Sequence, residues 1–404
     1  MSTVCIIGHP APGHINPTLP VAAELVSRGE RVIYYATEPF RARIQAAGAW
    51  FRSYGDHDLF ERNLARGGML GGMAGLIQTT EEILPALLEN VRGDEPDYLL
   101  VEAHAVWGNL LAQISGIPTA TLCSMFAISG RLIRPPELMR HLYGTGPREE
   151  VLEGLLSFSL YFEGARRLRG KYGASSPGII EYLANPQPLT VVFTSREFQV
   201  GGNVFDDSYK FVGPSVKAQV EEFAVAENPD PLIYISMGTM YNDEAEFYSE
   251  CFRAFGGARV RAVLATGHRM DKSKLPEIPA NFLVRDYVPQ MTVLGAADLF
   301  ITHGGINSAH ESMLCGVPML VLPQRADHHV VAGRVEAAGA GIVLERSMAT
   351  AARLAELASR VLSNPQFKLN SMHMGKSLRA AGGYQRAADE ILKFKQHAGI
   401  EERP

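Results

Sequence analysis

The sequence contains few cysteines, and none of them has the spacing that is typical of a metal site. The four cysteines lie far apart, three of them in apolar runs, at Cys5, Cys123, Cys251 and Cys315. No CxxC pair and no zinc-type pattern of cysteine and histidine occurs. This distribution predicts buried thiols in a reducing cytosol, and we expect no metal.

Clustered basic residues and long apolar runs are also missing. The 404 residues include 38 Lys and Arg against 43 Asp and Glu, a formal net charge of −5. Because phosphate backbones are bound by clustered cations, this balance argues against nucleic acid as a partner. No apolar run approaches the roughly 18 residues of a membrane span, and no signal peptide is evident. We therefore expect a cytoplasmic protein without membrane insertion.

Short apolar runs alternate with helical patterns along most of the chain. This βαβ rhythm predicts parallel sheets covered by helices. The expected strands are 4–7, 32–36, 98–101, 119–122, 190–194, 232–236, 260–265, 282–287, 299–302 and 318–322. No GxGxxG motif follows the first of these strands, so the sequence argues against a Rossmann dehydrogenase.

The predicted fold is α/β, with two Rossmann-like doubly wound domains facing a cleft. The first domain covers residues 1–210, and a polar, proline-containing linker covers 211–230. The second domain covers residues 231–384. Residues 385–404 form a C-terminal helix that could pack back on the N-terminal domain.

A glycine-rich turn, GHPAPGHINP at 8–17, follows the first expected strand. The spacing of Gly8 and Gly13 is that of a phosphate loop. His14 and Ile15, however, occupy the positions where such a loop has Lys and Ser or Thr. Taken alone, His14 is better explained as a turn or capping histidine than as a functional one.

A second glycine turn, ITHGGINSAHES at 301–312, connects an expected strand to a helix. Backbone N–H groups and the helix dipole at such a turn suit a phosphate. His303 and Ser308 could add donors, and Glu311 could accept from ribose hydroxyls. An ordinary helix start capped by Asn307 or Ser308 explains the same pattern.

Two further segments, DYVPQ at 286–290 and LPQRADHH at 322–329, follow expected strand ends. Gln324 and Asp327 could bind sugar hydroxyls through their short polar side chains. Each segment in isolation is better described as a polar loop.

Together these segments resemble the family 1 UDP-glycosyltransferases of GT-B fold, in the bacterial macrolide and flavonoid branch. The resemblance covers nearly the whole chain. It rests on PAPGHINP, the VGP of the linker, ISMGT, YVPQ, and the long segment from Thr302 to Gly341. It implies an inverting transfer of a sugar from a nucleotide donor to a hydroxyl of a hydrophobic small molecule, with no cofactor.

The resemblance also implies roles for single residues in donor binding. Val288 and Gln290 would contact the nucleobase, Glu311 the ribose, and Asp327, together with Gln324 and His328, the sugar. The diphosphate would be bound by residues of the two glycine-containing loops: Ser236, Gly238, Thr239, His303, Gly305, Asn307 and Ser308. The donor would be a UDP-sugar, with a dTDP-sugar as the alternative.

In this family His14 would be the general base, since an imidazole titrates near neutrality. The family usually has an Asp that orients this histidine, but the sequence PDYLLVEAH has Glu102 there. Glu102 is the expected partner, with His104 or no partner as alternatives. A second departure is His328, where members that use UDP-glucose commonly have Gln, so the sugar is left open.

The sequence defines the acceptor site less clearly than the donor site. The Gly- and Met-rich segment 67–77 and the aromatic segment 125–162 could line an apolar pocket or simply pack as surface helices. The paired glycines of the first segment suggest a mobile loop. Two other functions stay open: a nucleotide-sugar 2-epimerase of the same architecture, and a non-catalytic auxiliary relative. The sequence does not indicate an oligomeric state.

Overall fold

The structure is a computed structural model in which two compact units are described. It describes residues 1–55, 58, 60, 62, 68–130, 132, 148–174, 187–217, 223, 229–238, 244–268, 270–324 and 326–400. The first unit is Met1–Ser215 together with Ala381–Pro404, and the second is Val216–Ala380. The first boundary lies within the expected linker, and the chain returns to the first unit slightly before the expected residue 385. No helix among the described residues is long and apolar enough to cross a membrane.

The first unit contains a seven-stranded sheet in the order β3-β2-β1-β4-β5-β6-β7. Neighbouring strands pair in parallel throughout. The strands are β1 (Thr3–Ile7), β2 (Arg31–Ala36), β3 (Trp50–Ser53), β4 (Tyr98–Glu102), β5 (Thr119–Cys123), β6 (Thr190–Val192) and β7 (Tyr209–Phe211).

Helices cover both faces of this sheet, which explains why its central strands are apolar along their whole length. Alternate residues of β1 face opposite sides, so Ile7 belongs to one core and Ile6 to the other. The Ile7 face packs against α4 (Gly68–Asp94), α5 (Val106–Ser115) and α7 (Arg148–Tyr172). The Ile6 face packs against α1 (Pro12–Ser27), α2 (Arg41–Ala46) and α15 (Gly383–His397).

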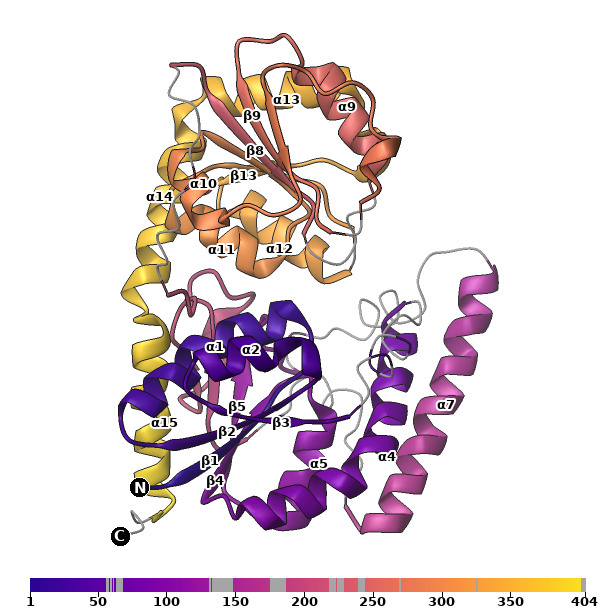
Figure 1. The fold of residues 1–404 in the computed structure, drawn as a ribbon, viewed down its shortest axis with the longest axis vertical. Coiled ribbons are helices and arrows are strands. Elements are labelled where there is room, and N and C mark those ends of the chain that lie inside the picture. The colour runs from indigo at the N-terminus through magenta and orange to yellow at the C-terminus, as the bar shows by residue number, and fades with distance from the viewer. Residues whose placement is uncertain are drawn as a thin grey trace. The chain divides into compact units, whose positions relative to one another are not determined.

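Helix α15 is part of the first unit's core although it comes from the far end of the chain. It runs beside α1 (Figure 1) and buries Ala387 and Ile391. The Lys395 ammonium lies 2.7 Å from the Glu30 carboxylate, and both side chains are buried. The Tyr98 hydroxyl donates to the same carboxylate at 2.9 Å. A buried pair that is hydrogen-bonded in this way fixes the position of the helix.

The second unit contains a six-stranded parallel sheet in the order β10-β9-β8-β11-β12-β13. Its strands are β8 (Leu232–Ser236), β9 (Arg261–Ala265), β10 (Phe282–Arg285), β11 (Leu299–Thr302), β12 (Met319–Val321) and β13 (Gly341–Val343). Its helices are α9 (Ala245–Phe255), α10 (Gln290–Ala296), α11 (Ile306–Leu314), α12 (Ala326–Ala337), α13 (Ala351–Ser363) and α14 (Pro365–Ala380). Short 3-10 turns occur in the two units at Glu38–Phe40, Gly202–Val204, Lys272–Lys274 and Arg346–Met348.

The prediction of two doubly wound parallel α/β domains is confirmed, but one local expectation is wrong. Of the glycine-rich segment 67–77, residues from Gly68 on form the start of helix α4 and not a mobile loop. Met73, Leu76 and Ile77 are 2%, 5% and 1% exposed and lie in the core of the first unit. Their packing outweighs the weak helix propensity of the glycines. The aromatic segment is described only in part, and from residue 148 it forms the continuous helix α7.

Candidate active site

Each sheet has one point where the strand order reverses, and predicted site residues follow the strands at that point. In the first sheet the reversal lies between β1 and β4, and in the second between β8 and β11. Open α/β sheets bind ligands beyond the carboxyl ends of the strands at such points. His14 follows β1 and Glu102 ends β4, while Ser236 ends β8 and His303 follows β11.

His14 lies in the first turn of α1, directly after the tight turn that leaves β1. Pro12 begins the helix, at the position where its missing N–H and fixed φ are tolerated best. Gly8 allows the turn to lie against β2, because a Cβ there would come within 2.7 Å of the Tyr34 ring. Close packing on a neighbouring strand therefore explains Gly8, whereas a Cβ on Gly13 would meet nothing within 4 Å.

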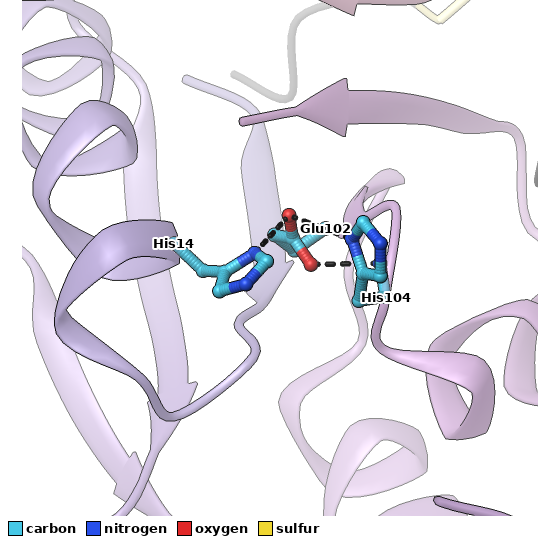
Figure 2. A group of neighbouring side chains, drawn as sticks. All are labelled: His14, Glu102 and His104. Carbon is cyan, nitrogen blue, oxygen red and sulfur yellow. Dashed lines mark hydrogen bonds and ion pairs between the residues drawn. The ribbon is translucent and has the colours of Figure 1, made fainter. Parts of the chain in front are cut away.

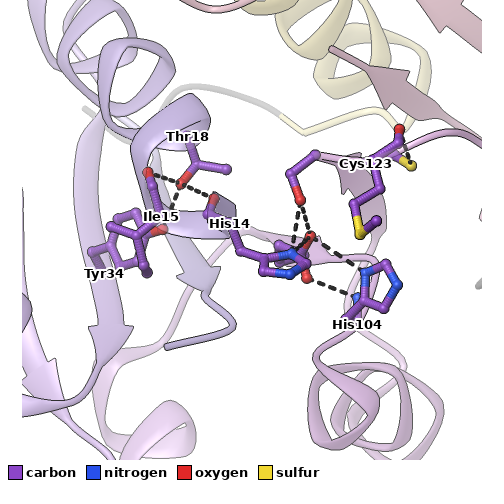
Figure 3. A network of polar contacts seen from close by, with 9 residues as sticks. His14, Ile15, Thr18, Tyr34, His104 and Cys123 are labelled. Carbon is purple, nitrogen blue, oxygen red and sulfur yellow. Dashed lines mark hydrogen bonds and ion pairs between the residues drawn. The ribbon is translucent and has the colours of Figure 1, made fainter. Parts of the chain in front are cut away.

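The first turn of α1 is also held by hydrogen bonds beside His14 (Figure 3). The Thr18 hydroxyl lies 2.6 Å from the Tyr34 hydroxyl and donates to the Ile15 carbonyl at 2.9 Å. Thr18 and Tyr34 are buried, so this contact ties the helix to β2 in a water-excluded place. The backbone that carries His14 is thereby fixed.

The structure brings His14 and Glu102 into direct contact (Figure 2). Nδ1 of His14 lies 2.8 Å from Oε1 of Glu102, whose side chain is fully buried, while that of His14 is 16% exposed. The Ser124 hydroxyl donates to the same Oε1 at 2.6 Å and lies 2.8 Å from Nδ1 of His14. When Nδ1 carries the proton toward Glu102, Nε2 has the free lone pair of a base.

Glu102 is anchored through its other oxygen as well. The backbone N–H of His104 donates to Oε2 at 2.7 Å, and Nδ1 of His104 lies 3.7 Å from Oε1. Burial by itself raises the pKa of the Glu102 carboxyl. The charges and hydrogen bonds of His14 and His104 outweigh burial and hold this pKa well below its usual range. Glu102 is therefore a carboxylate at neutral pH and can stabilise an imidazolium.

His9, which the sequence did not single out, lies beside His14. The two ring centroids are 4.5 Å apart, edge to face, and His9 stacks on Trp107 at 5.9 Å. Burial, followed by the charge of His14, lowers the pKa of His9 well below its usual value. The His9 ring is therefore neutral and packs against the ring of His14.

In the second unit, the predicted glycine turn begins helix α11. Gly304 has a φ of +85°, and Gly305 is the N-cap, so the N-terminus of the helix, with the backbone N–H groups of its first turn, lies at this point. A Cβ on Gly305 or on Gly238 would lie 2.6 Å or 2.7 Å from the His303 ring. The two glycines therefore make room for His303 between the loops that follow β8 and β11.

His303 is neutral in this environment. Burial, and then the charge of His328, lowers the pKa of His303 to about 3. The His328 ring lies 4.7 Å away, edge to face, and its Nε2 is 3.6 Å from the Asp327 carboxylate. His303 thus offers hydrogen-bonding groups rather than a charge.

A hydrogen-bond chain connects Gln290, Ser308 and Glu311. The Gln290 amide donates to Glu311 at 2.6 Å and to the Ser308 hydroxyl at 3.3 Å. Its carbonyl accepts from the Tyr234 hydroxyl at 3.0 Å. Tyr234 is buried in β8, where its ring stacks on Phe300. Burial raises the pKa of Glu311, and the hydrogen bond from Gln290 opposes this shift.

The remaining predicted donor residues are less closely connected. The Gln324 amide donates to Glu244 at 3.0 Å, and the Glu244 carboxylate also pairs with Arg346. Val288 is buried before α10, and Asn307 lies in the first turn of α11. Thr239 lies outside the described residues.

Besides His9, the sequence interpretation missed three residues that hydrogen-bond to the predicted site residues. Ser124 follows β5, the strand next to Glu102, so a hydroxyl at that strand end was the available signal. Tyr234 sits within an apolar strand and Glu244 outside the recognised motifs, so neither carried a signal. All three act through another side chain, which a motif does not reveal.

Comparisons with known proteins show which family the chain is similar to. The family model for the C-terminal domain of erythromycin biosynthesis protein CIII-like proteins matches residues 259–391. An uncharacterized UDP-glucosyltransferase, YojK of Bacillus subtilis, is 33% identical over 406 residues, covering 97% of each chain. The NDP-glycosyltransferase YjiC of Bacillus licheniformis is 35% identical and covers 98% of each chain.

Solved structures show the same likeness over the whole chain. The glycosyltransferase of kitacinnamycin has a TM-score of 0.84 at 26% identity, covering 97% of this chain and 98% of its own. The calicheamicin glycosyltransferase CalG4 has a TM-score of 0.83 at 26% identity, covering 98% of each chain. The chain therefore belongs to the family 1 glycosyltransferases of GT-B fold and is a glycosyltransferase enzyme.

Proposed function

We propose that this enzyme moves a sugar from a UDP-sugar to a hydroxyl of a hydrophobic small molecule, with inversion at the anomeric carbon and with His14 as the general base. The observation that carries the proposal is the 2.8 Å contact between Nδ1 of His14 and Oε1 of the buried Glu102. A carboxylate accepts hydrogen bonds, so this contact supports the tautomer that carries its proton on Nδ1 and can accept one at Nε2.

In the proposed step, Nε2 of His14 takes the proton from the acceptor hydroxyl while the oxygen attacks the anomeric carbon. The new carbon–oxygen bond forms as the bond from that carbon to the diphosphate breaks, and UDP leaves with the bonding electrons. The proton stays on His14, and the charge of Glu102 stabilises the resulting imidazolium. Attack opposite the leaving group inverts the anomeric configuration.

The donor would be held by the second unit. The N-terminus of α11, with Gly305, Asn307 and Ser308, suits the diphosphate, whose negative charge grows as the bond breaks. Ser236, Gly238 and Thr239 would bind from the loop after β8.

A neutral His303 donates a hydrogen bond to this diphosphate without adding a charge. Gln290 and Val288 would contact the base, and Glu311 the ribose. The sugar would meet Gln324, Asp327 and His328.

The acceptor class is supported by the names of relatives. An oleandomycin glycosyltransferase of Streptomyces antibioticus is 28% identical, covering 94% of this chain and 88% of its own. A demethyllactenocin mycarosyltransferase of Streptomyces fradiae is 30% identical, covering 95% and 84%. We propose a polyketide, macrolide or flavonoid-like acceptor, met in the cytoplasm.

A screen by mass spectrometry tests the proposal. The protein is incubated with UDP- and dTDP-sugars and a mixed panel of macrolide and flavonoid aglycones. We expect a product heavier by one sugar, formed faster from a UDP-sugar, and a β-linkage by NMR when the donor is α-linked. Conversion of the nucleotide sugar to its 2-epimer without an aglycone product, or retention of configuration, would contradict it.

A further inference from the structure

Three side chains near β1 and β4 bring potential metal ligands together. His14, Glu102 and His104 each offer one ligand atom, and these atoms lie within 4.8 Å of one another (Figure 2). The set contains two imidazoles and one carboxylate. This is the set of protein ligands that many zinc sites use when they leave one position open to solvent.

The distances are close to those of a real site. With bonds of about 2.0–2.1 Å, tetrahedral zinc ligands lie about 3.3 Å apart. Oε1 of Glu102 lies 2.8 Å from Nδ1 of His14 and 3.7 Å from Nδ1 of His104. One value is below and the other above the ideal separation, and the ligand atoms of the two histidines lie within 4.8 Å of each other. Rotations of the two rings that bring these nitrogens closer together would complete the geometry. The side chain of His104 is 24% exposed, which leaves room for such a rotation.

The surroundings favour a cation at this place. Glu102 is fully buried and its Oε2 is fixed by the backbone N–H of His104, an outer contact that orients the ligand oxygen. The imidazoles of His14 and His104 keep 16% and 24% exposure, so an ion can reach them from solvent. A buried carboxylate flanked by two imidazoles also supplies the nitrogen and oxygen donors that late first-row metals bind well.

We propose that His14, Glu102 and His104 bind a divalent first-row metal ion such as Zn²⁺, and that the bound ion inhibits the enzyme. The site itself needs only the geometry above, while the inhibition rests on the proposed function. A metal on Nδ1 of His14 replaces the hydrogen bond to Glu102. A neutral imidazole that binds a metal through Nδ1 carries its proton on Nε2, so Nε2 has no lone pair with which to take the proton of the acceptor hydroxyl.

Cobalt binding tests the site without any need for transfer activity. The EDTA-treated full chain is titrated with Co²⁺, whose visible absorption reports nitrogen and oxygen ligands in four- or five-coordinate sites, and Zn²⁺ is then added as a competitor. We expect one equivalent per chain in the wild type and at least tenfold weaker binding in His104→Ala. That variant keeps the backbone N–H to Glu102, and circular dichroism checks its fold, with His104→Gln as a second variant.

His397→Ala serves as the matched control, because His397 is an exposed histidine on α15. Its cobalt affinity should equal that of the wild type. Absence of a cobalt spectrum in the wild type, or unchanged affinity in both His104 variants, would overturn the proposal.

Inhibition of sugar transfer by Zn²⁺ distinguishes the proposed metal site from the proposed function. Zn²⁺ should stop sugar transfer, EDTA should restore it, and His104→Ala should raise the half-inhibiting Zn²⁺ concentration at least tenfold. A cobalt spectrum in a chain that transfers no sugar supports the site and contradicts the proposed function. Transfer that Zn²⁺ leaves untouched, in a chain without a cobalt spectrum, contradicts the site alone.

Discussion

Nδ1 of His14 and Oε1 of Glu102 lie 2.8 Å apart, although 88 residues separate them in the chain. The contact arises because β1 and β4 are parallel neighbours with Ile7 opposite Val101, so both strands deliver their next residues to one edge. Glu reaches His14 here despite its extra methylene relative to the expected Asp. The Ser124 hydroxyl and the His104 backbone hold its two oxygens in place.

Replacing His14 by Ala should remove the proposed general base. We expect the transfer rate to fall by about 10²- to 10⁴-fold, the usual contribution of general base catalysis. UDP affinity, measured by calorimetry, should stay nearly unchanged. Full activity in this variant, or lost UDP binding, would contradict the assignment.

Replacing Glu102 by Ala should slow transfer less than the loss of His14, because the base remains and only its orienting charge is removed. Glu102→Gln keeps the size of the side chain and serves as the matched variant. Because the pKa of Glu102 is held well below its usual range, its charge should be constant through neutral pH. A wild-type rate in both variants, measured in single turnovers, would exclude Glu102 as the orienting group.

Tyr234 should act on donor binding through Gln290. Removing its hydroxyl in Tyr234→Phe frees the Gln290 amide to rotate, so KM for the UDP-sugar should rise about two- to tenfold, with little change in kcat. A double-mutant cycle with Gln290→Ala checks the coupling. Strictly additive effects would show that Tyr234 acts by packing alone.

His328 should influence the choice of sugar. Its ring lies against His303 and near Asp327. His328→Gln therefore changes the hydrogen-bonding groups and the length of the side chain beside the proposed sugar site. The ratio of kcat/KM values for UDP-glucose, UDP-galactose and UDP-xylose should shift toward glucose. An unaltered profile would show that His328 is not a selector.

His310, inside α11, should make stability depend on pH. Burial lowers its folded-state pKa to about 3, below the unfolded value, so below about pH 6.5 the unfolded chain binds the extra proton. The part of the free energy of unfolding that depends on a neutral His310 is fully present above about pH 6.5. It is lost as the pH falls toward 3, by about 1.4 kcal/mol per pH unit. His310→Leu should flatten this slope in urea unfolding followed by circular dichroism.

Fluorescence is unsuitable for that measurement, because Trp50 and Trp107 both lie in the first unit. His397→Leu, at an exposed position, is the control and should keep the wild-type slope. An equal slope in all three chains would contradict the prediction for His310.

The sequence predicted the central strands well, because buried parallel strands such as β1 and β8 are continuous apolar runs. It did not predict β3, β7 and β13, which are short and in part exposed. The sequence also pointed to His14 and His303, because each lies in a glycine-rich turn that is recognisable as a local sequence pattern. Tyr234 and Ser124 act through contacts with residues distant in the chain, and no local pattern encodes such contacts.

The position of α15 has a consequence for synthesis. Ala387 and Ile391 complete the core that also contains Ile6 and Val21, yet they are translated after the whole second unit. The core of the unit that carries His14 is therefore complete only after α15, which is translated last, has packed onto it. Shortening the chain before Lys395 would leave Glu30 without its buried cation, and would destabilise the first unit from a point far from any recognised motif.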